Sequence, residues 1–100
     1  MANEVAFHQL AFDDLDALED FIARDSPERA AAFIGRIRQF CSSLVEFPER
    51  GRLREDFGTG IRTLSFERRV VVAYEVRRRT VLILRIFYAG QDYGPESFSI

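Results

Sequence analysis

Three apolar segments fill most of residues 61–88, and short clusters rich in arginine separate them. The segments cover residues 61–66, 70–76 and 81–88. Apolar and polar side chains that alternate over segments of this length are typical of β-strands. Because short connections join antiparallel neighbours, the pattern predicts an antiparallel meander of three strands in the second half of the chain.

A helix is predicted over residues 13–24, after a weak strand signal at residues 4–10. Asp13 and Asp14 suit the start of this helix, because acidic side chains stabilise a helix N-terminus. Its apolar side chains recur at helical spacing and form one stripe: Leu15, Leu18 and Ile22, with Phe21 beside them. The stripe predicts that one side of the helix packs against other elements.

A second helix is predicted over residues 27–44, which gives it about 18 residues and a length of roughly 27 Å. Ser26 is a favourable N-cap, and Pro27 fits the first helical position because its missing N–H needs no partner there. Pro48 ends the helical pattern. The short link between the helices predicts an antiparallel hairpin. Gly35 weakens the second helix slightly and would allow close packing.

The predicted fold is α+β, with the order β-α-α-β-β-β and a single domain over residues 1–100. One face of the small antiparallel sheet needs a cover, and the helical hairpin supplies it. The other face stays open to solvent or a partner. The tail after Ala89 is polar and contains glycine and proline, so we expect loose packing there. The expected helix-side core consists of Leu15, Leu18, Ile22, Phe33, Ile37 and Leu44.

All 14 basic residues are arginine. A GC-rich genome explains this bias, and so does selection of some arginines for their fork geometry, which lysine cannot copy. Residues 1–49 contain ten acidic residues and four arginines, net −6, and residues 50–100 contain six acidic residues and ten arginines, net +4, which sum to −2. The basic half could attract an acidic partner, whereas the overall charge argues against a general nucleic-acid binder.

The cytoplasm is the expected location. The apolar runs are far too short to span a bilayer, and the N-terminus lacks the basic and apolar regions of a signal peptide. The lone cysteine, Cys41, cannot form an internal disulfide and lies on the apolar stripe of the second helix, so we assign it to the core.

Most catalytic schemes lack the residues that they need. His8 is the one histidine, and no set of ligands has metal-site spacing. We therefore expect no catalytic residues, no metal and no cofactor. The acidic residues of the first helix are read as a solvated face, with a partner-binding patch as the alternative: Asp13, Asp14, Asp16, Glu19 and Asp20.

Two arginines lie inside apolar strands, where a charge is costly unless it is paired or used. Arg62 lies between Ile61 and Thr63. Arg85 lies between Leu84 and Ile86, and strand alternation places it on one face with Val81, Ile83 and Phe87. One interpretation is a bidentate ion pair with Glu67, Glu75 or Asp92. The other is an anion-binding groove for phosphate or carboxylate.

Several short motifs follow one another in the chain. They are the A-x-x-D-L-x-x-L-x-x-F-I pattern of residues 11–22, Ser26-Pro27 with Ala30 and Phe33, Pro48-x-x-Gly51-Arg52, Gly60-Ile61-Arg62-x-Leu64, Tyr74-x-Val76, and VLILRIFYAGQD at residues 81–92. In this order they resemble the RelE/ParE superfamily of bacterial type II toxins, and the ParE branch more than the RelE branch.

The resemblance implies a toxin that a cognate antitoxin neutralises. Such antitoxins usually have a ribbon-helix-helix DNA-binding part and a tail that wraps the toxin, so the toxin would reach DNA only through the antitoxin. ParE-like toxins act on DNA gyrase, whereas RelE-like relatives cleave mRNA on the ribosome. The residues that the resemblance assigns to partner binding are Arg62, Tyr74, Arg85, Phe87, Tyr88, Gln91, Asp92 and Tyr93.

The ribonuclease alternative would use Arg62, Arg85 and Tyr88, which this chain keeps. The chain departs from the family where Tyr88 replaces a common histidine and where Gln91 and Glu75 replace common arginines. These departures remove basic groups that RNA cleavage would need. The resemblance therefore favours inhibition of gyrase, with a ribosome-dependent endoribonuclease as the alternative.

Overall fold

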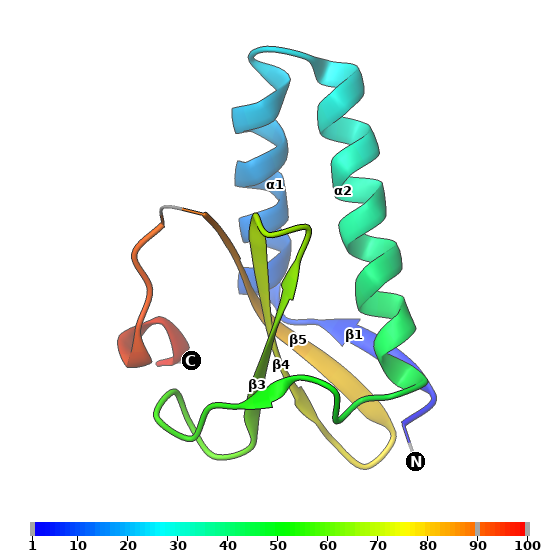
Figure 1. Ribbon diagram of the computed structural model, residues 1–100, viewed down its shortest axis with the longest axis vertical. Helices are drawn as coiled ribbons and strands as arrows, with labels where there is room; N and C mark the ends of the chain where they lie inside the picture. The colour runs from blue at the N-terminus through cyan, green and yellow to red at the C-terminus, as the bar shows by residue number, and fades with distance from the viewer. Residues whose placement is uncertain (1, 90, 100) are drawn as a thin grey trace.

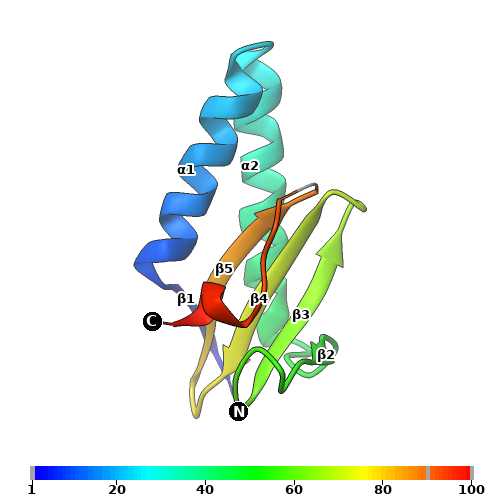
Figure 2. The same cartoon turned by 90° about the vertical axis from the view of Figure 1, so that its left-hand side faces the viewer.

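The computed structural model describes residues 2–89 and 91–99. Two helices pack against one face of a five-stranded sheet, as the predicted α+β fold requires (Figures 1 and 2). The elements in chain order are β1 (Glu4–Phe7), α1 (Gln9–Ala23), α2 (Pro27–Ser42), the 3-10 turn η1 (Ser43–Val45), β2 (Arg52–Leu53), β3 (Ile61–Phe66), β4 (Val70–Val76), β5 (Thr80–Tyr88) and the 3-10 turn η2 (Pro95–Phe98).

The sheet is mixed rather than wholly antiparallel. Its strand order is β1-β5-β4-β3-β2, and β1 runs parallel to β5, with Glu4 opposite Thr80 and Phe7 opposite Ile83. The other neighbours are antiparallel, as the short connections predicted. The long connection that β1 requires is supplied by the helices and the strands that follow them. The two-residue strand β2 was not predicted, because it lies within a loop pattern.

Helix α1 begins at Gln9, four residues before the predicted start. His8 is its N-cap, and Nδ1 of His8 accepts a hydrogen bond from the backbone N–H of Leu10 at 3.0 Å. His8 therefore caps a helix and is not a residue of a strand. Asp13 and Asp14 consequently lie in the second turn of α1, where they cannot cap it.

Helix α2 begins where the sequence predicted. Ser26 Oγ accepts a hydrogen bond from Arg29 N at 3.2 Å, and Pro27 is the first helical residue. The helix ends at Ser42, and the turn η1 completes the segment that was predicted as helix. Gly35 is exposed, and a Cβ built there would meet nothing within 4 Å. Gly35 therefore allows no close packing, contrary to expectation.

The main core lies between the helices and the sheet. Five of its six predicted residues are buried, and Ile22 packs against them half-buried. Cys41 and Tyr74 are fully buried in the same cluster. This arrangement confirms the predicted packing and the assignment of Cys41 to the core.

A second cluster covers the face of the sheet that was expected to be open. Its buried residues are Phe57, Ile61, Ala73, Leu84 and Phe87. The C-terminal segment lies across them (Figure 2), where Tyr93 stacks on Phe87 with ring centroids 4.2 Å apart and Phe98 stacks on Phe57 at 5.0 Å. The prediction of a loosely packed tail is therefore wrong, because aromatic residues spaced along a polar segment hold it in place.

A β-bulge interrupts β5. Ala73 of β4 is opposite Arg85 and Tyr74 is opposite Ile83, so Leu84 has no partner of its own. The extra residue changes which face the following side chains occupy. Val81 and Ile83 belong to the helix-side core, whereas Phe87 belongs to the opposite cluster. Regular alternation placed all three on one face with Arg85, and that prediction is wrong.

None of the helices in the described part of the chain combines the length and the apolar character that a membrane crossing requires.

Candidate partner-binding site

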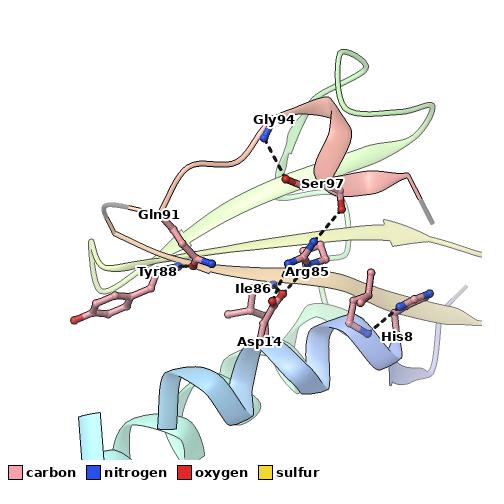
Figure 3. A network of polar contacts seen from close by, with 9 residues as sticks. His8, Asp14, Arg85, Ile86, Tyr88, Gln91, Gly94 and Ser97 are labelled. Atoms are coloured by element: carbon pink, nitrogen blue, oxygen red, sulfur yellow. Dashed lines mark hydrogen bonds and ion pairs between the residues drawn. The ribbon is translucent and has the colours of Figure 1, made fainter. Parts of the chain in front are cut away.

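Arg85 forms a two-point ion pair with Asp14 of α1 (Figure 3). Arg85 Nε lies 2.8 Å from Asp14 Oδ2, and a terminal guanidinium nitrogen lies 2.9 Å from Oδ1. The other terminal nitrogen donates to the carbonyl of Ser97 at 3.0 Å. The hydrogen bonding between Arg85 and Asp14 is the main cause of the raised pKa of Arg85.

Arg85 thus forms an ion pair, as one interpretation predicted, but its partner is Asp14 and not Glu67, Glu75 or Asp92. Asp14 is distant in sequence, and only the packing of α1 beside β5 brings it to Arg85. Only 10% of the Asp14 side chain is exposed, so Asp14 does not belong to a solvated acidic face. Because all three guanidinium nitrogens of Arg85 are engaged, no free pair of donors remains to bind an anion.

The same region closes the free edge of β5. Strand β1 ends at Phe7, so β5 has no neighbouring strand on that side beyond Ile83. Ile86 N donates to Asp14 Oδ2 at 2.8 Å, and Tyr88 N donates to Gln91 Oε1 at 2.8 Å. Two side chains therefore take the place of a further strand.

Arg62 serves the loop that precedes β2. Its terminal nitrogen donates to the carbonyl of Gly51 at 2.9 Å and to that of Glu49 at 3.2 Å. Tyr74 holds the same loop, because its hydroxyl donates to Pro48 O at 2.8 Å and accepts from Gly51 N at 2.9 Å. Burial raises the pKa of Tyr74. These contacts explain the Pro48-x-x-Gly51 motif as a structural one.

The three ribonuclease candidates all make contacts within the chain. Arg62 holds the loop before β2, Arg85 holds α1, and the ring of Tyr88 lies 6.2 Å from that of Phe21. Arg85 and Tyr88 thus both contact α1, whereas Arg62 contacts a different part of the chain.

The predicted partner-binding residues also differ in exposure. Tyr74 and Phe87 are buried, because one fills the helix-side core and the other lies under the tail, so neither presents its side chain to a partner. Tyr88 and Tyr93 are half-buried, and Gln91 and Asp92 are exposed.

A mostly apolar hollow of about 220 Å³ lies between α1 and the free edge of β5. Phe21, which is 55% exposed, and Tyr88 line it and also line a second hollow of about 340 Å³ that reaches Arg29 and Arg36 of α2. We call the two together the edge groove. Of its residues the sequence indicated Tyr88 and Gln91, and Asp14 as part of the alternative acidic patch, and an apolar Phe21 beside the helical stripe was a further signal.

An arginine-lined hollow of about 470 Å³ lies on the other side of the sheet. Arg50, Arg52 and Arg54 line it together with Thr63 and Ser65. Arg54 is held by Asp56 at 2.8 Å, and this hydrogen bond is the main cause that lowers the pKa of Asp56. These arginines were not predicted as a binding surface, although their alternate spacing places them on one side of an extended chain.

Groups that could carry acid–base chemistry have structural roles. His8 caps α1, and burial raises the pKa of Cys41 to about 12. Within residues 2–89 and 91–99, no three histidine, cysteine or acidic side chains gather as metal ligands would.

Comparison with known proteins finds toxins named after both ParE and RelE. Residues 5–93 match the family described as "ParE toxin of type II toxin-antitoxin system, parDE". Toxin RelE2 of Caulobacter vibrioides is 34% identical over 88 residues, which cover 88% of this chain and 97% of that protein. A solved structure described as a chromosomal ParDE TA system from P. aeruginosa has a TM-score of 0.72 and 28% identity, and the match covers 85% of this chain and 94% of that one.

Proposed function

Since the chain belongs to the ParE toxin family of type II toxin–antitoxin systems, we propose that it acts by binding DNA gyrase and inhibiting it, without chemistry of its own. The observation that carries this proposal is the ion pair between Arg85 and Asp14. A ribonuclease would need Arg85 free to stabilise charge on a phosphodiester. Here the guanidinium already donates to a carboxylate and to the Ser97 carbonyl.

Two further observations support binding without catalysis. RNA cleavage needs one group to remove a proton and another to supply one. His8 is committed to capping α1, and arginine stays protonated. Arg62 is engaged with the loop before β2, whereas Arg85 and Tyr88 both contact α1, through Asp14 and Phe21.

We also propose that a cognate ParD-like antitoxin, with a ribbon-helix-helix DNA-binding part, neutralises this toxin in the cytoplasm. The edge groove is a suitable surface for its tail. Phe21 and Tyr88 give it exposed aromatic area, and Arg29 gives it a positive end. A segment with apolar and acidic side chains would complement these groups.

The test of the main proposal uses purified gyrase, relaxed plasmid, ATP and increasing amounts of the toxin. We expect loss of supercoiling or accumulation of cleaved DNA at toxin concentrations comparable to that of the enzyme. Unaffected gyrase, together with cuts in ribosome-bound mRNA, would reject gyrase inhibition in favour of the alternative.

The antitoxin proposal predicts an antitoxin gene beside the toxin gene, and it is tested by co-expression of the two. The two proteins should co-elute in size-exclusion chromatography, and Phe21→Asp should weaken the complex. Glu28→Arg on the exposed start of α2 is a control, because Glu28 does not line the groove. Separate elution of the two wild-type proteins would reject the proposal.

A ribosome-dependent endoribonuclease is the second candidate, because the arginine-lined hollow suits a phosphate backbone. If this function holds, Arg52→Ala should abolish mRNA cleavage and leave the fold unchanged. Cleavage by purified ribosomes programmed with one mRNA, with and without toxin, is the measurement.

A further inference from the structure

The turn between β3 and β4 has a backbone that its residues do not favour. Glu67 and Arg68 have φ angles of 50° and 60°, and Arg69 N donates to Phe66 O at 3.1 Å. Hairpin turns with two positive φ angles usually contain Asn-Gly or Asp-Gly, because larger side chains are strained there. In the described part of the chain no other residue except glycine has a positive φ.

Ion pairs fix this turn against helix α2. Glu67 lies 2.8 Å and 3.1 Å from two nitrogens of Arg36, and 3.2 Å from Arg69. Arg36 and Arg69 also lie over the ring of Phe33, at 5.3 Å and 4.5 Å from its centroid. Glu67 remains partly exposed, so these contacts do not enlarge the hydrophobic core. Their effect is to hold the end of the hairpin in one orientation.

Arg68 lies at the end of the hairpin and is exposed. Within the part of the chain that the structure describes, its side chain forms no ion pair or hydrogen bond. It borders a hollow of about 240 Å³ that Ser65, Tyr88 and Tyr93 also line, and none of the lining residues is acidic. The site therefore presents a positive charge at a hollow whose described lining contains no acidic residue to neutralise it.

We infer that this turn contacts an acidic segment of the target protein and that Arg68 determines the specificity of that contact. The inference rests on the proposed inhibition of gyrase by binding, and it adds which surface of the toxin contacts the target. Strained backbone persists where function requires it. The turn holds the backbone of Arg68 in place, and its guanidinium can bind a carboxylate through two donors.

The test compares Arg68→Glu with Arg78→Glu. Arg78 is also exposed, lies in the β4–β5 turn at the opposite end of the strands (Figure 2), and gives the same change in net charge. In the gyrase assay we expect the half-inhibitory concentration to rise about tenfold or more for Arg68→Glu and less than about twofold for Arg78→Glu. The difference should narrow as salt is added.

Arg68→Gly separates contact from folding. Glycine accepts the backbone of this turn, and Glu67 keeps its ion pairs, so the thermal midpoint should stay equal or rise while inhibition falls. Affinity for the antitoxin should not change in either Arg68 variant. Full inhibition by Arg68→Glu, or equal losses with Arg78→Glu, would overturn the inference while leaving gyrase inhibition intact.

Growth arrest in cells tests the turn in the case that the target is not gyrase. If wild-type toxin leaves gyrase unaffected, the proposed function fails, and the same variants are then compared by growth arrest after induction in cells. Reduced arrest with Arg68→Glu but not with Arg78→Glu would support the turn as the target contact. Equal arrest with wild type and Arg68→Glu, or no arrest with wild type, would overturn it.

Discussion

Asp14 satisfies three donors at the point where β5 loses its neighbouring strand. One carboxylate accepts from two nitrogens of Arg85 and from the backbone N–H of Ile86. An uncovered strand edge invites pairing with other chains. At the residue scale, a single helical side chain therefore fastens α1, protects the edge of β5 and, through Arg85, holds the tail at Ser97.

Asp14→Ala should destabilise the fold by roughly 2 to 3 kcal/mol, because it leaves a largely buried guanidinium without its carboxylate. Chemical denaturation measures this loss. Asp16→Ala is the control, since Asp16 is exposed on the same helix and should change stability by less than about 0.5 kcal/mol. Equal denaturation midpoints for the two variants would show that the pair adds no stability.

Gly51 illustrates a close approach that only glycine permits. A Cβ at this position would lie 2.5 Å from the hydroxyl oxygen of Tyr74 and 2.9 Å from a ring carbon. Gly51→Ala should therefore destabilise the fold by about 1 to 3 kcal/mol, since either the buried tyrosine or the loop must move. A thermal melt in which Gly51→Ala matches wild type would contradict this packing.

At the scale of elements, local signals made some boundaries predictable. Ser26-Pro27 set the start of α2, and charged turns separated β3, β4 and β5. The start of α1 was missed because histidine is an unusual cap, and the bulge in β5 was missed because nothing in the apolar run marks it. Local patterns also cannot show that β1 pairs with β5.

The site was harder to predict than the fold. Arg85 was recognised as needing a partner, but several acidic residues were equally plausible and the actual one depends on tertiary packing. The positions of Arg62 and Tyr74 in motifs suggested function, whereas the structure assigns both to the loop around Gly51. The edge groove forms only when α1 meets β5, so no single segment contains it.

Gly35→Ala should stabilise α2. The residue is in the helix interior, its backbone is exposed, and a methyl group there meets no atom within 4 Å. Alanine is favoured over glycine in a helix by about 0.5 to 1 kcal/mol, which should raise the thermal midpoint by roughly 2 to 8 °C. Circular dichroism melts test this, and Gly51→Ala gives the opposite sign. An unchanged or lower midpoint for Gly35→Ala would show that the site is less open than described.

At the scale of the whole molecule, one sheet carries two apolar layers. The helices cover one face, and the C-terminal segment covers the other through Tyr93 and Phe98 (Figure 2). Cys41 lies in the larger layer with no exposed surface. Its thiol can therefore report on opening of the helix-side core as a unit.

Cys41 should resist alkylation in the native protein at pH 8 and react at least about a thousandfold faster in denaturant. Burial raises its pKa to about 12 from an ordinary 9.0, so the folded state keeps the proton. Above pH 9 the unfolded chain loses the thiol proton that the folded protein keeps. The stability of the fold that depends on this thiol is therefore complete below pH 9 and is lost as the pH rises from 9 toward 12. Iodoacetamide labelling followed by mass spectrometry measures the rates. Rapid labelling of native protein would place Cys41 outside the core.

Because Glu4 pairs with Thr80, β1 can enter the sheet only after most of the chain has been synthesised. Translation adds about 5 to 20 residues per second, so β1 is made roughly 4 to 15 s before the strand that it pairs with. From the completion of α2 at Ser42 until β5 is made, the helical hairpin lacks the sheet that covers its apolar stripe. The nascent chain therefore exposes apolar surface from that point on, and its surfaces are complete only after the segment that follows β5 covers the second face of the sheet.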